Sequence, residues 1–219
     1  MQRPDTRTKR VGQALALDGS TARIDALYEA WASDYDQDLR EERYQAPGYM
    51  AVLANELRQR GELEAHGSRL RVLDAGCGTG LVGVELRRAF ADAELIGFDL
   101  SQAMVDEAAR TGCYDRLQGG VDLNQPLAPQ ILTEHFDLAL ACGVFTLGHV
   151  PPGSIEHLVR VLRPGGVVLV SARHSYCDQT DFDAVCEQLV ARGTVSELFS
   201  VDGRYIADED ARYRALRRL

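Results

Sequence analysis

The chain has 219 residues, 45% of them hydrophobic and 26% charged, which is typical of a folded globular protein and excludes a disordered or fibrous one. The formal net charge of −9 disfavours nucleic-acid binding, because an acidic surface repels phosphate groups. No hydrophobic run approaches the roughly 20 residues that cross a bilayer, so we expect no membrane contact.

The cysteines and the basic residues indicate a cellular setting. Five scattered cysteines without a CxxC pair predict neither disulfides nor a metal site, and they favour a reducing cytoplasm. One lysine against 23 arginines is typical of a GC-rich bacterial genome.

The first third of the chain predicts a helical cap. Residues 1–20 are polar and lack periodicity, which predicts a flexible leader. From Thr21 to about Arg43, hydrophobic and aromatic residues recur every three to four positions, which predicts a helix. Pro47 suits the first turn of a second helix that ends near Gly61. We assign residues 21–66 to an N-terminal cap or lid.

From residue 70 onward, short hydrophobic runs alternate with helical segments. The predicted strands cover residues 70–74, 94–98, a segment ending near 122, 135–141, 167–171, 194–201 and 205–214. The predicted helices cover 81–90, 101–110, 155–162 and 181–192. The last two strands, joined at Asp202-Gly203, form an expected antiparallel hairpin. This order predicts an α/β domain over residues 67–219, with a doubly wound, mostly parallel seven-stranded sheet and helices on both faces.

A glycine-rich loop follows the first strand, from Val72 to Gly80. Glycines at alternate positions let the backbone turn sharply and let a ligand lie against bare main chain. Asp99 follows 19 residues after Gly80, at the end of the next strand, where a carboxylate can accept hydrogen bonds from both hydroxyls of a ribose. The pattern therefore predicts a nucleoside site at the carboxyl ends of the first two strands.

The identity of the nucleoside depends on Asp74. A carboxylate just before the loop repels a pyrophosphate and attracts an ammonium or sulfonium group, which disfavours a dinucleotide. Gly78-x-Gly80-x-x-Gly83 also satisfies the dinucleotide fingerprint, so an NAD-dependent oxidoreductase remains an alternative.

Five ordered segments resemble the class I S-adenosylmethionine-dependent methyltransferases. They are the glycine-rich loop, Asp99, Asp122, the strand at 136–142 and the turn at 162–166, within about residues 70–175. The resemblance implies a Rossmann-like fold, S-adenosylmethionine as cofactor and S-adenosylhomocysteine as product.

The resemblance also implies a role for each cofactor-binding residue. Asp74 would face the methionine ammonium group, Asp99 the ribose hydroxyls and Asp122 the adenine amine; Tyr35 would close over the methionine part. Loop capping is the alternative for Asp122, and ordinary packing for Tyr35. The expected cofactor-binding residues are Tyr35, Asp74, Ala75, Gly76, Cys77, Gly78, Gly80, Asp99, Leu100, Met104, Asp122, Leu123 and Cys142.

His149 is the candidate catalytic residue. It follows the fourth strand, on the side of the sheet where the transferable methyl group is expected, and imidazole titrates near neutrality. We expect a general base or a substrate-orienting group; the alternative is a loop histidine that caps the turn before Pro151. The expected substrate contacts are Tyr28, Trp31, His149, His174 and Tyr176.

Segments outside the core resemble a narrower group. Residues 35–38, 143–151 and 205–214 are similar to the methyltransferase-like 27 (Williams–Beuren region) group and its bacterial relatives, whose substrates are mostly undefined. Signatures of DNA, cytosine-C5 and arginine methyltransferases are missing from the fourth-strand loop. We therefore expect methyl transfer to an oxygen or nitrogen atom of a small molecule, by a monomer or homodimer. A non-catalytic S-adenosylmethionine-binding protein is the other alternative.

Overall fold

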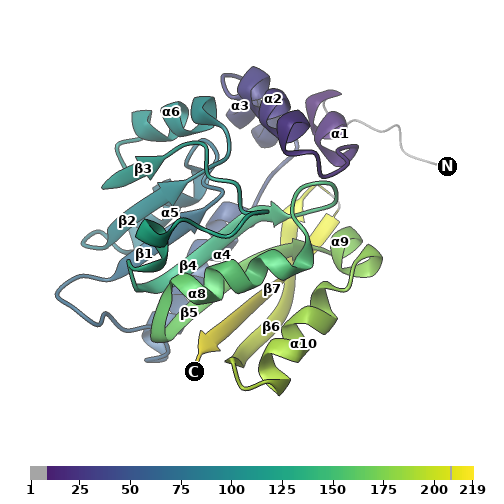
Figure 1. The fold of residues 1–219 in the computed structure, drawn as a ribbon. Helices are drawn as coiled ribbons and strands as arrows, with labels where there is room; N and C mark the ends of the chain where they lie inside the picture. The colour runs from purple at the N-terminus through teal and green to yellow at the C-terminus, as the bar shows by residue number, and fades with distance from the viewer. Residues whose placement is uncertain (1–8, 208) are drawn as a thin grey trace.

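The computed structural model describes residues 9–207 and 209–219, built around one seven-stranded sheet (Figure 1). The strands are β1 (Arg71–Ala75), β2 (Glu94–Phe98), β3 (Arg116–Gln118), β4 (Phe136–Phe145), β5 (Leu162–Arg173), β6 (Val195–Ile206) and β7 (Glu209–Arg218). Their order is β3-β2-β1-β4-β5-β7-β6. The first five strands pair in parallel, and β7 pairs antiparallel with both β5 and β6. The predicted doubly wound sheet with an antiparallel C-terminal hairpin is confirmed.

Helices cover both faces of the sheet and its carboxyl edge. They are α1 (Lys9–Leu15), α2 (Thr21–Trp31), α3 (Tyr35–Glu41), α4 (Ala46–Gln59), α5 (Leu81–Ala89), α6 (Gln102–Arg110), α7 (Pro129–Leu132), α8 (Ile155–Val161), α9 (His174–Gln179) and α10 (Phe182–Ala191), with a 3-10 turn η1 (Pro152–Ser154). In Figure 1, α1, α2 and α3 lie together above one end of the sheet, α8 lies in front of it and α4 behind. Among the described residues, no helix has the length and hydrophobicity to cross a membrane.

The central strands are hydrophobic on both sides because both sheet faces are covered. Leu138 and Leu140 pack into the cluster formed with α4 and α5. Ala139 and Ala141, which alternate with them, pack into the cluster formed with α8 and α10. Successive side chains of a strand point to opposite faces, so an uninterrupted hydrophobic run fits a strand buried on both sides.

The N-terminal region differs from the expected long helix and leader. The helix expected over 21–43 is interrupted between α2 and α3, where Ser33 and Asp34 have polar side chains that favour turns over helix interiors. Residues 1–8 of the predicted leader lie outside the described residues, and residues 9–15 form α1. Its Val11 and Ala14, three positions apart, are buried in the same hydrophobic cluster as Trp31.

The C-terminal hairpin does not turn at Asp202-Gly203 as expected. β6 continues through Gly203 to Ile206, and β7 begins at Glu209. Gly203 is needed for packing: a Cβ atom there would lie 2.5 Å from Cε1 of Tyr49 on α4. The glycine marks a close approach between a strand and a helix.

Asp137 joins three segments at the start of β4. Its carboxylate accepts hydrogen bonds from the backbone N–H of His66 (3.1 Å) and of Arg71 (2.9 Å), and from Nε of Arg163 (2.6 Å). The Asp137 side chain is 2% exposed, so these donors replace the water contacts that it loses on burial.

We expect Asp137→Ala to lower the free energy of unfolding by roughly 3–5 kcal/mol, because it leaves a largely buried guanidinium and two N–H groups without their acceptor. Chemical denaturation of both proteins measures the difference. Asp92→Ala, at an exposed position, is the control, and we expect it to change stability by less than about 0.5 kcal/mol. Equal effects of the two substitutions would contradict this account of Asp137.

Candidate functional site

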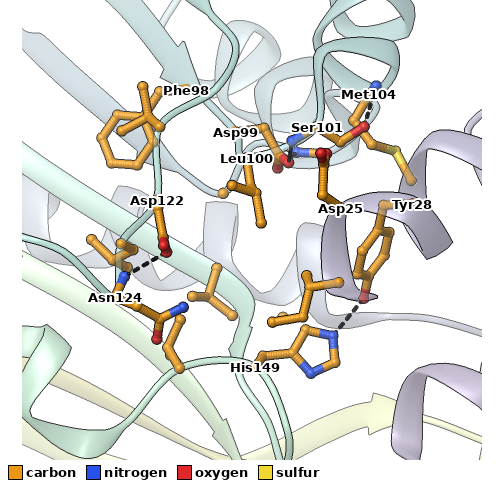
Figure 2. A pocket seen from close by; sticks show the side chains of 18 of the residues that line it. Asp25, Tyr28, Phe98, Asp99, Leu100, Ser101, Met104, Asp122, Asn124 and His149 are labelled. Carbon is orange, nitrogen blue, oxygen red and sulfur yellow. Dashed lines mark hydrogen bonds between the residues drawn. The ribbon is translucent and has the colours of Figure 1, made fainter. Parts of the chain in front are cut away.

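A cavity of about 740 Å³ lies where β1, β2 and β4 end, beneath α2 (Figure 2). We call it the strand-end cavity. Of the expected cofactor-binding residues, it is lined by Tyr35, Gly76, Gly78, Asp99, Leu100, Met104, Asp122, Leu123 and Cys142.

The glycine-rich loop is fixed to the end of β2. The carbonyl oxygen of Phe98 accepts hydrogen bonds from the backbone N–H of Gly76 (2.8 Å) and of Cys77 (2.9 Å). Gly76 has a φ of +71°, and a Cβ atom there would lie 2.5 Å from Cγ2 of Val144. Only glycine fits this turn without displacing Val144 near the end of β4.

Asp99 and Asp122 bring two carboxylates into the strand-end cavity. Asp99 accepts from the backbone N–H of Gly78 (2.8 Å) through Oδ2 and from that of Ser101 (3.0 Å) through Oδ1, which leaves each oxygen able to accept again. Burial raises the pKa of Asp99, and backbone N–H groups oppose the rise. Asp122 accepts from the backbone N–H of Asn124 (2.9 Å), so it caps its own loop and also lines the cavity.

Helix α2 is held over the strand-end cavity at several points. Glu29 accepts from the backbone N–H of Ala103 (3.0 Å) at the start of α6. Thr21 donates its hydroxyl to Asp122 (3.0 Å). Just before the helix, the backbone N–H of Gly19 donates to the carbonyl oxygen of Gly148 (2.9 Å). Helix α2 and the residues just before it are therefore bonded to α6, to Asp122 and to the loop after β4.

His149 faces Tyr28 at the edge of the strand-end cavity (Figure 2). Its Nδ1 lies 3.0 Å from the carbonyl oxygen of Leu147, so Nδ1 carries the proton. Nε2 then accepts from the hydroxyl of Tyr28 (2.8 Å). Burial lowers the pKa of His149 and raises that of Tyr28, so both side chains are neutral at neutral pH. An unprotonated Nε2 is the form that a general base requires.

A second, smaller cavity adjoins the first. We call it the aromatic chamber, since its walls include Tyr28, Trp31, Tyr35, Tyr44 and Tyr205. The two cavities share the lining residues Tyr28, Tyr35, Gly143 and His149.

Four expected cofactor-binding residues support the loop without lining the strand-end cavity. Ala75 and Cys77 are buried, and Gly80, with a φ of +91°, precedes the first turn of α5. Asp74 is fully buried and accepts from the hydroxyl of Tyr114 (2.7 Å), while its Oδ1 has no hydrogen-bond partner among the described residues. Burial raises the pKa of Asp74 from 3.8 to about 7.

The expected substrate contacts divide into two groups. Tyr28, Trp31 and His149 line the aromatic chamber. His174 and Tyr176 line neither cavity: His174 is paired with Asp202 (3.0 Å), and the hydroxyl of Tyr176 donates to the carbonyl oxygen of Val150 (2.9 Å). The latter two remain predictions without support from their positions.

Sequence analysis missed several lining residues. Asp25 lines the strand-end cavity three positions before Tyr28, and residues at that spacing share one face of a helix. Arg173 lines the aromatic chamber and is the last residue of β5. Its position at a strand end could have identified it in the sequence as a site residue. Tyr44 has no comparable position in the sequence pattern that could have identified it as a lining residue. In the described part of the chain, no group of three His, Cys, Asp or Glu residues is arranged to hold a metal ion.

Comparisons with known proteins agree with this arrangement. The family described as "Methyltransferase domain" matches residues 72–166. Methyltransferase-like protein 27 from Homo sapiens is 37% identical over 147 residues, which are 67% of this chain and 56% of that protein. Residues 72–166 belong to this methyltransferase family, and the fold is that of the class I S-adenosylmethionine-dependent methyltransferases. The family predicted from the sequence motifs is confirmed, and with it S-adenosylmethionine as the family's cofactor.

Two further similar proteins belong to this comparison. The malonyl-[acyl-carrier protein] O-methyltransferase of Dechloromonas aromatica is 31% identical over 127 residues, 50% of this chain and 42% of that protein. The crystal structure of magnesium protoporphyrin IX methyltransferase from Synechocystis PCC 6803 with bound S-adenosylhomocysteine has a TM-score of 0.65 at 17% identity, over 91% of this chain and 99% of that one. The chain spans about half the length of the curated relatives it matches.

The residues of the strand-end cavity fit the cofactor of this family. The charged side chains that line the strand-end cavity are all acidic, Asp25, Asp99 and Asp122, and a positively charged ligand is attracted by them. Above Gly78 no atom lies within 4 Å of where a Cβ would be, so the main chain there is bare. Leu100 and Met104 add hydrophobic surface suited to a base.

The raised pKa of Asp74 predicts a pH-dependent stability. The folded state holds the proton more tightly than the unfolded state, so its stabilising effect is full below pH 3.8 and is lost as the pH rises to about 7. This loss amounts to roughly 4 kcal/mol at most. Asp74→Asn removes the titration and keeps an acceptor for Tyr114. In chemical denaturation without cofactor, we expect the variant to be more stable than the wild type at pH 8, with the difference vanishing near pH 4. A difference that does not change with pH would contradict this.

Proposed function

We propose that the protein transfers a methyl group from S-adenosylmethionine to an oxygen or nitrogen atom of a small-molecule acceptor. The observation that carries the proposal is the junction of the two cavities: the acid-lined strand-end cavity and the aromatic chamber share Tyr28, Tyr35 and His149. A donor in one cavity and an acceptor in the other would meet beside a neutral imidazole.

The strand-end cavity would hold the cofactor, which when bound supplies an activated methyl group on a positively charged sulfur. Asp99 would accept from the ribose hydroxyls through the lone pairs that its backbone partners leave free. Asp122 would accept from the adenine amine, while Leu100 and Met104 would pack against the base. Tyr35, which borders both cavities, would help exclude water.

His149 would take up the proton that an acceptor hydroxyl or amine must lose. Its Nδ1–H is held by the carbonyl oxygen of Leu147, and its Nε2, which accepts from Tyr28, would take the proton once the acceptor replaces the Tyr28 hydroxyl. Methyl transfer depends mostly on aligning the reacting atoms, so the remaining residues need only hold the acceptor in place. The relative from Dechloromonas aromatica is named an O-methyltransferase, which supports an oxygen acceptor.

We further propose a cytoplasmic bacterial protein that acts on a metabolite rather than on nucleic acid, as a monomer or homodimer. The acidic net charge supports the acceptor class. All five cysteines are free thiols, which supports a reducing compartment.

The assignment of Asp99 predicts a loss of cofactor affinity. We expect Asp99→Asn to weaken binding of S-adenosylmethionine and S-adenosylhomocysteine by about 1.5–3 kcal/mol, the usual contribution of hydrogen bonds to a charged group. Isothermal titration calorimetry measures both affinities. Asp106→Asn, on the exposed side of α6, is the matched control. Unchanged affinity in Asp99→Asn would remove the ribose assignment.

The assignment of His149 predicts a loss of turnover. We expect His149→Gln to reduce the rate of methyl transfer by about 10²–10⁴-fold, as for the loss of a general base, while the affinity for S-adenosylhomocysteine changes little. The assay uses methyl-labelled S-adenosylmethionine with a panel of phenols, amines and hydroxy acids. His66→Gln, an exposed histidine at the opposite edge of the sheet, is the control.

Two results would contradict these roles. Full turnover in His149→Gln would exclude the histidine as a base. Tight cofactor binding by the wild type without turnover of any acceptor would support the non-catalytic alternative.

A further inference from the structure

The aromatic chamber contains a buried cation that the proposed methyl transfer does not use. The guanidinium of Arg173, at the end of β5, is 6% exposed and lies 5.5 Å from the centre of the Tyr205 ring. Its Nη2 donates to Glu209, but its Nε has no hydrogen-bond partner among the described residues. A buried donor without an acceptor is costly, so its retention indicates that a ligand supplies the acceptor.

A second unpartnered donor lines the same chamber. The hydroxyl of Thr146 is buried and also has no hydrogen-bond partner among the described residues. Thr146 follows β4 and Arg173 ends β5, two strands that pair in parallel. Two independent segments thus bring one charged and one neutral donor to one small space.

The charges around Arg173 favour a single negative charge on the ligand. Of the described residues that line the chamber, Arg173 is the only one that is charged at neutral pH, since burial keeps the four tyrosines and His149 neutral. Glu209, outside the lining, is paired with Arg173 and accepts from the hydroxyl of Ser175 (2.7 Å). This pairing already places one negative charge beside Arg173 and leaves its Nε without an acceptor, which disfavours a dianion such as phosphate.

The walls of the chamber favour a flat hydrophobic body. Trp31 and Tyr35 meet edge to face with ring centres 4.7 Å apart, and Tyr44 and Tyr205 do so at 5.2 Å. Aromatic faces and edges stack on planar ligands. The charged residues that line the strand-end cavity are all acidic, whereas the one that lines the aromatic chamber is the cation Arg173, so the walls of the two cavities differ in charge.

We propose that the aromatic chamber binds the methyl acceptor through Arg173 and Thr146, and that the acceptor is a small, flat, hydrophobic carboxylic acid. The inference rests on the proposed methyltransferase function and adds the substrate class. The carboxylate accepts from Nε of Arg173 and from the Thr146 hydroxyl, and the hydrophobic body extends between the rings toward His149.

Matched pairs of acids and amides test the proposal. The protein is saturated with S-adenosylhomocysteine, and calorimetry at neutral pH measures the binding of benzoate, 4-hydroxybenzoate and indole-3-acetate beside their uncharged amides. We expect at least one acid to bind about tenfold or more tightly than its amide, because a hydrogen bond to a charged group is lost in the amide. Equal binding of acid and amide in every pair, or no measurable binding of any acid, would overturn the proposal.

Variants assign the preference to the chamber. Arg173→Met should abolish the preference for the acid, and Thr146→Val should reduce it several-fold. Since Arg173→Met leaves Glu209 without its cation, the double variant Arg173→Met/Glu209→Gln repeats the test without an unpaired charge. Arg212→Met, which removes an arginine paired with Asp183 outside both cavities, should retain the preference. A preference for the acid that survives in the double variant would also overturn the proposal.

The same titrations separate this proposal from the proposed function. S-adenosylhomocysteine binding is measured first in every protein. A wild type that fails to bind it contradicts the methyltransferase proposal, whereas normal binding followed by equal affinities for acids and amides contradicts only the acceptor class.

Discussion

The main-chain connection between the ends of β1 and β2 determines where every other part of the site can lie. The carbonyl oxygen of Phe98 accepts from two consecutive N–H groups of the glycine-rich loop, and the Asp99 carboxylate accepts from a third. The loop must therefore cross the end of β2 at close range, and the side chain of Val144 leaves room only for glycine at position 76. With that path fixed, α5 and α6 begin at set positions, and α2 can rest on the N-terminus of α6 through Glu29.

The same side chains of the N-terminal helices form part of the wall of both the strand-end cavity and the aromatic chamber, which differ in chemistry. Tyr28 and Tyr35 border both the acid-lined cavity and the aromatic chamber. The acids of the first space come from the ends of β2 and β3 and from α2, whereas the cation of the second comes from the end of β5. Sheet order separates them, because β1 and β4 lie between. Ligands of opposite charge can thus occupy adjacent sites without competing for the same groups.

Sequence analysis located the residues whose position depends on strand ends alone. Asp99, Gly76 and Asp122 follow parallel strands, and such strands bring their carboxyl ends to one edge. His174 and Tyr176 were expected there on the same reasoning, but the chain turns into α9 directly after Arg173 and carries both away. Tyr44 and Tyr205 meet across 160 residues of chain, a contact that no local pattern encodes. Gly203 had the appearance of a turn residue, and only the packing of Tyr49 explains why it stands inside a strand.

The hydrogen bond between Tyr28 and His149 has a consequence for the order of events. Tyr28 belongs to α2, the helix that covers the strand-end cavity. His149 belongs to the loop after β4, in which the carbonyl oxygen of Gly148 accepts a hydrogen bond from Gly19, just before α2. Helix α2 therefore holds one side of the imidazole through Tyr28, and the carbonyl oxygen of Leu147 holds the other. In the proposed reaction the Nε2 lone pair becomes free only when the Tyr28 hydroxyl leaves it, so Tyr28 would keep the imidazole from acting on water until an acceptor replaces the phenol.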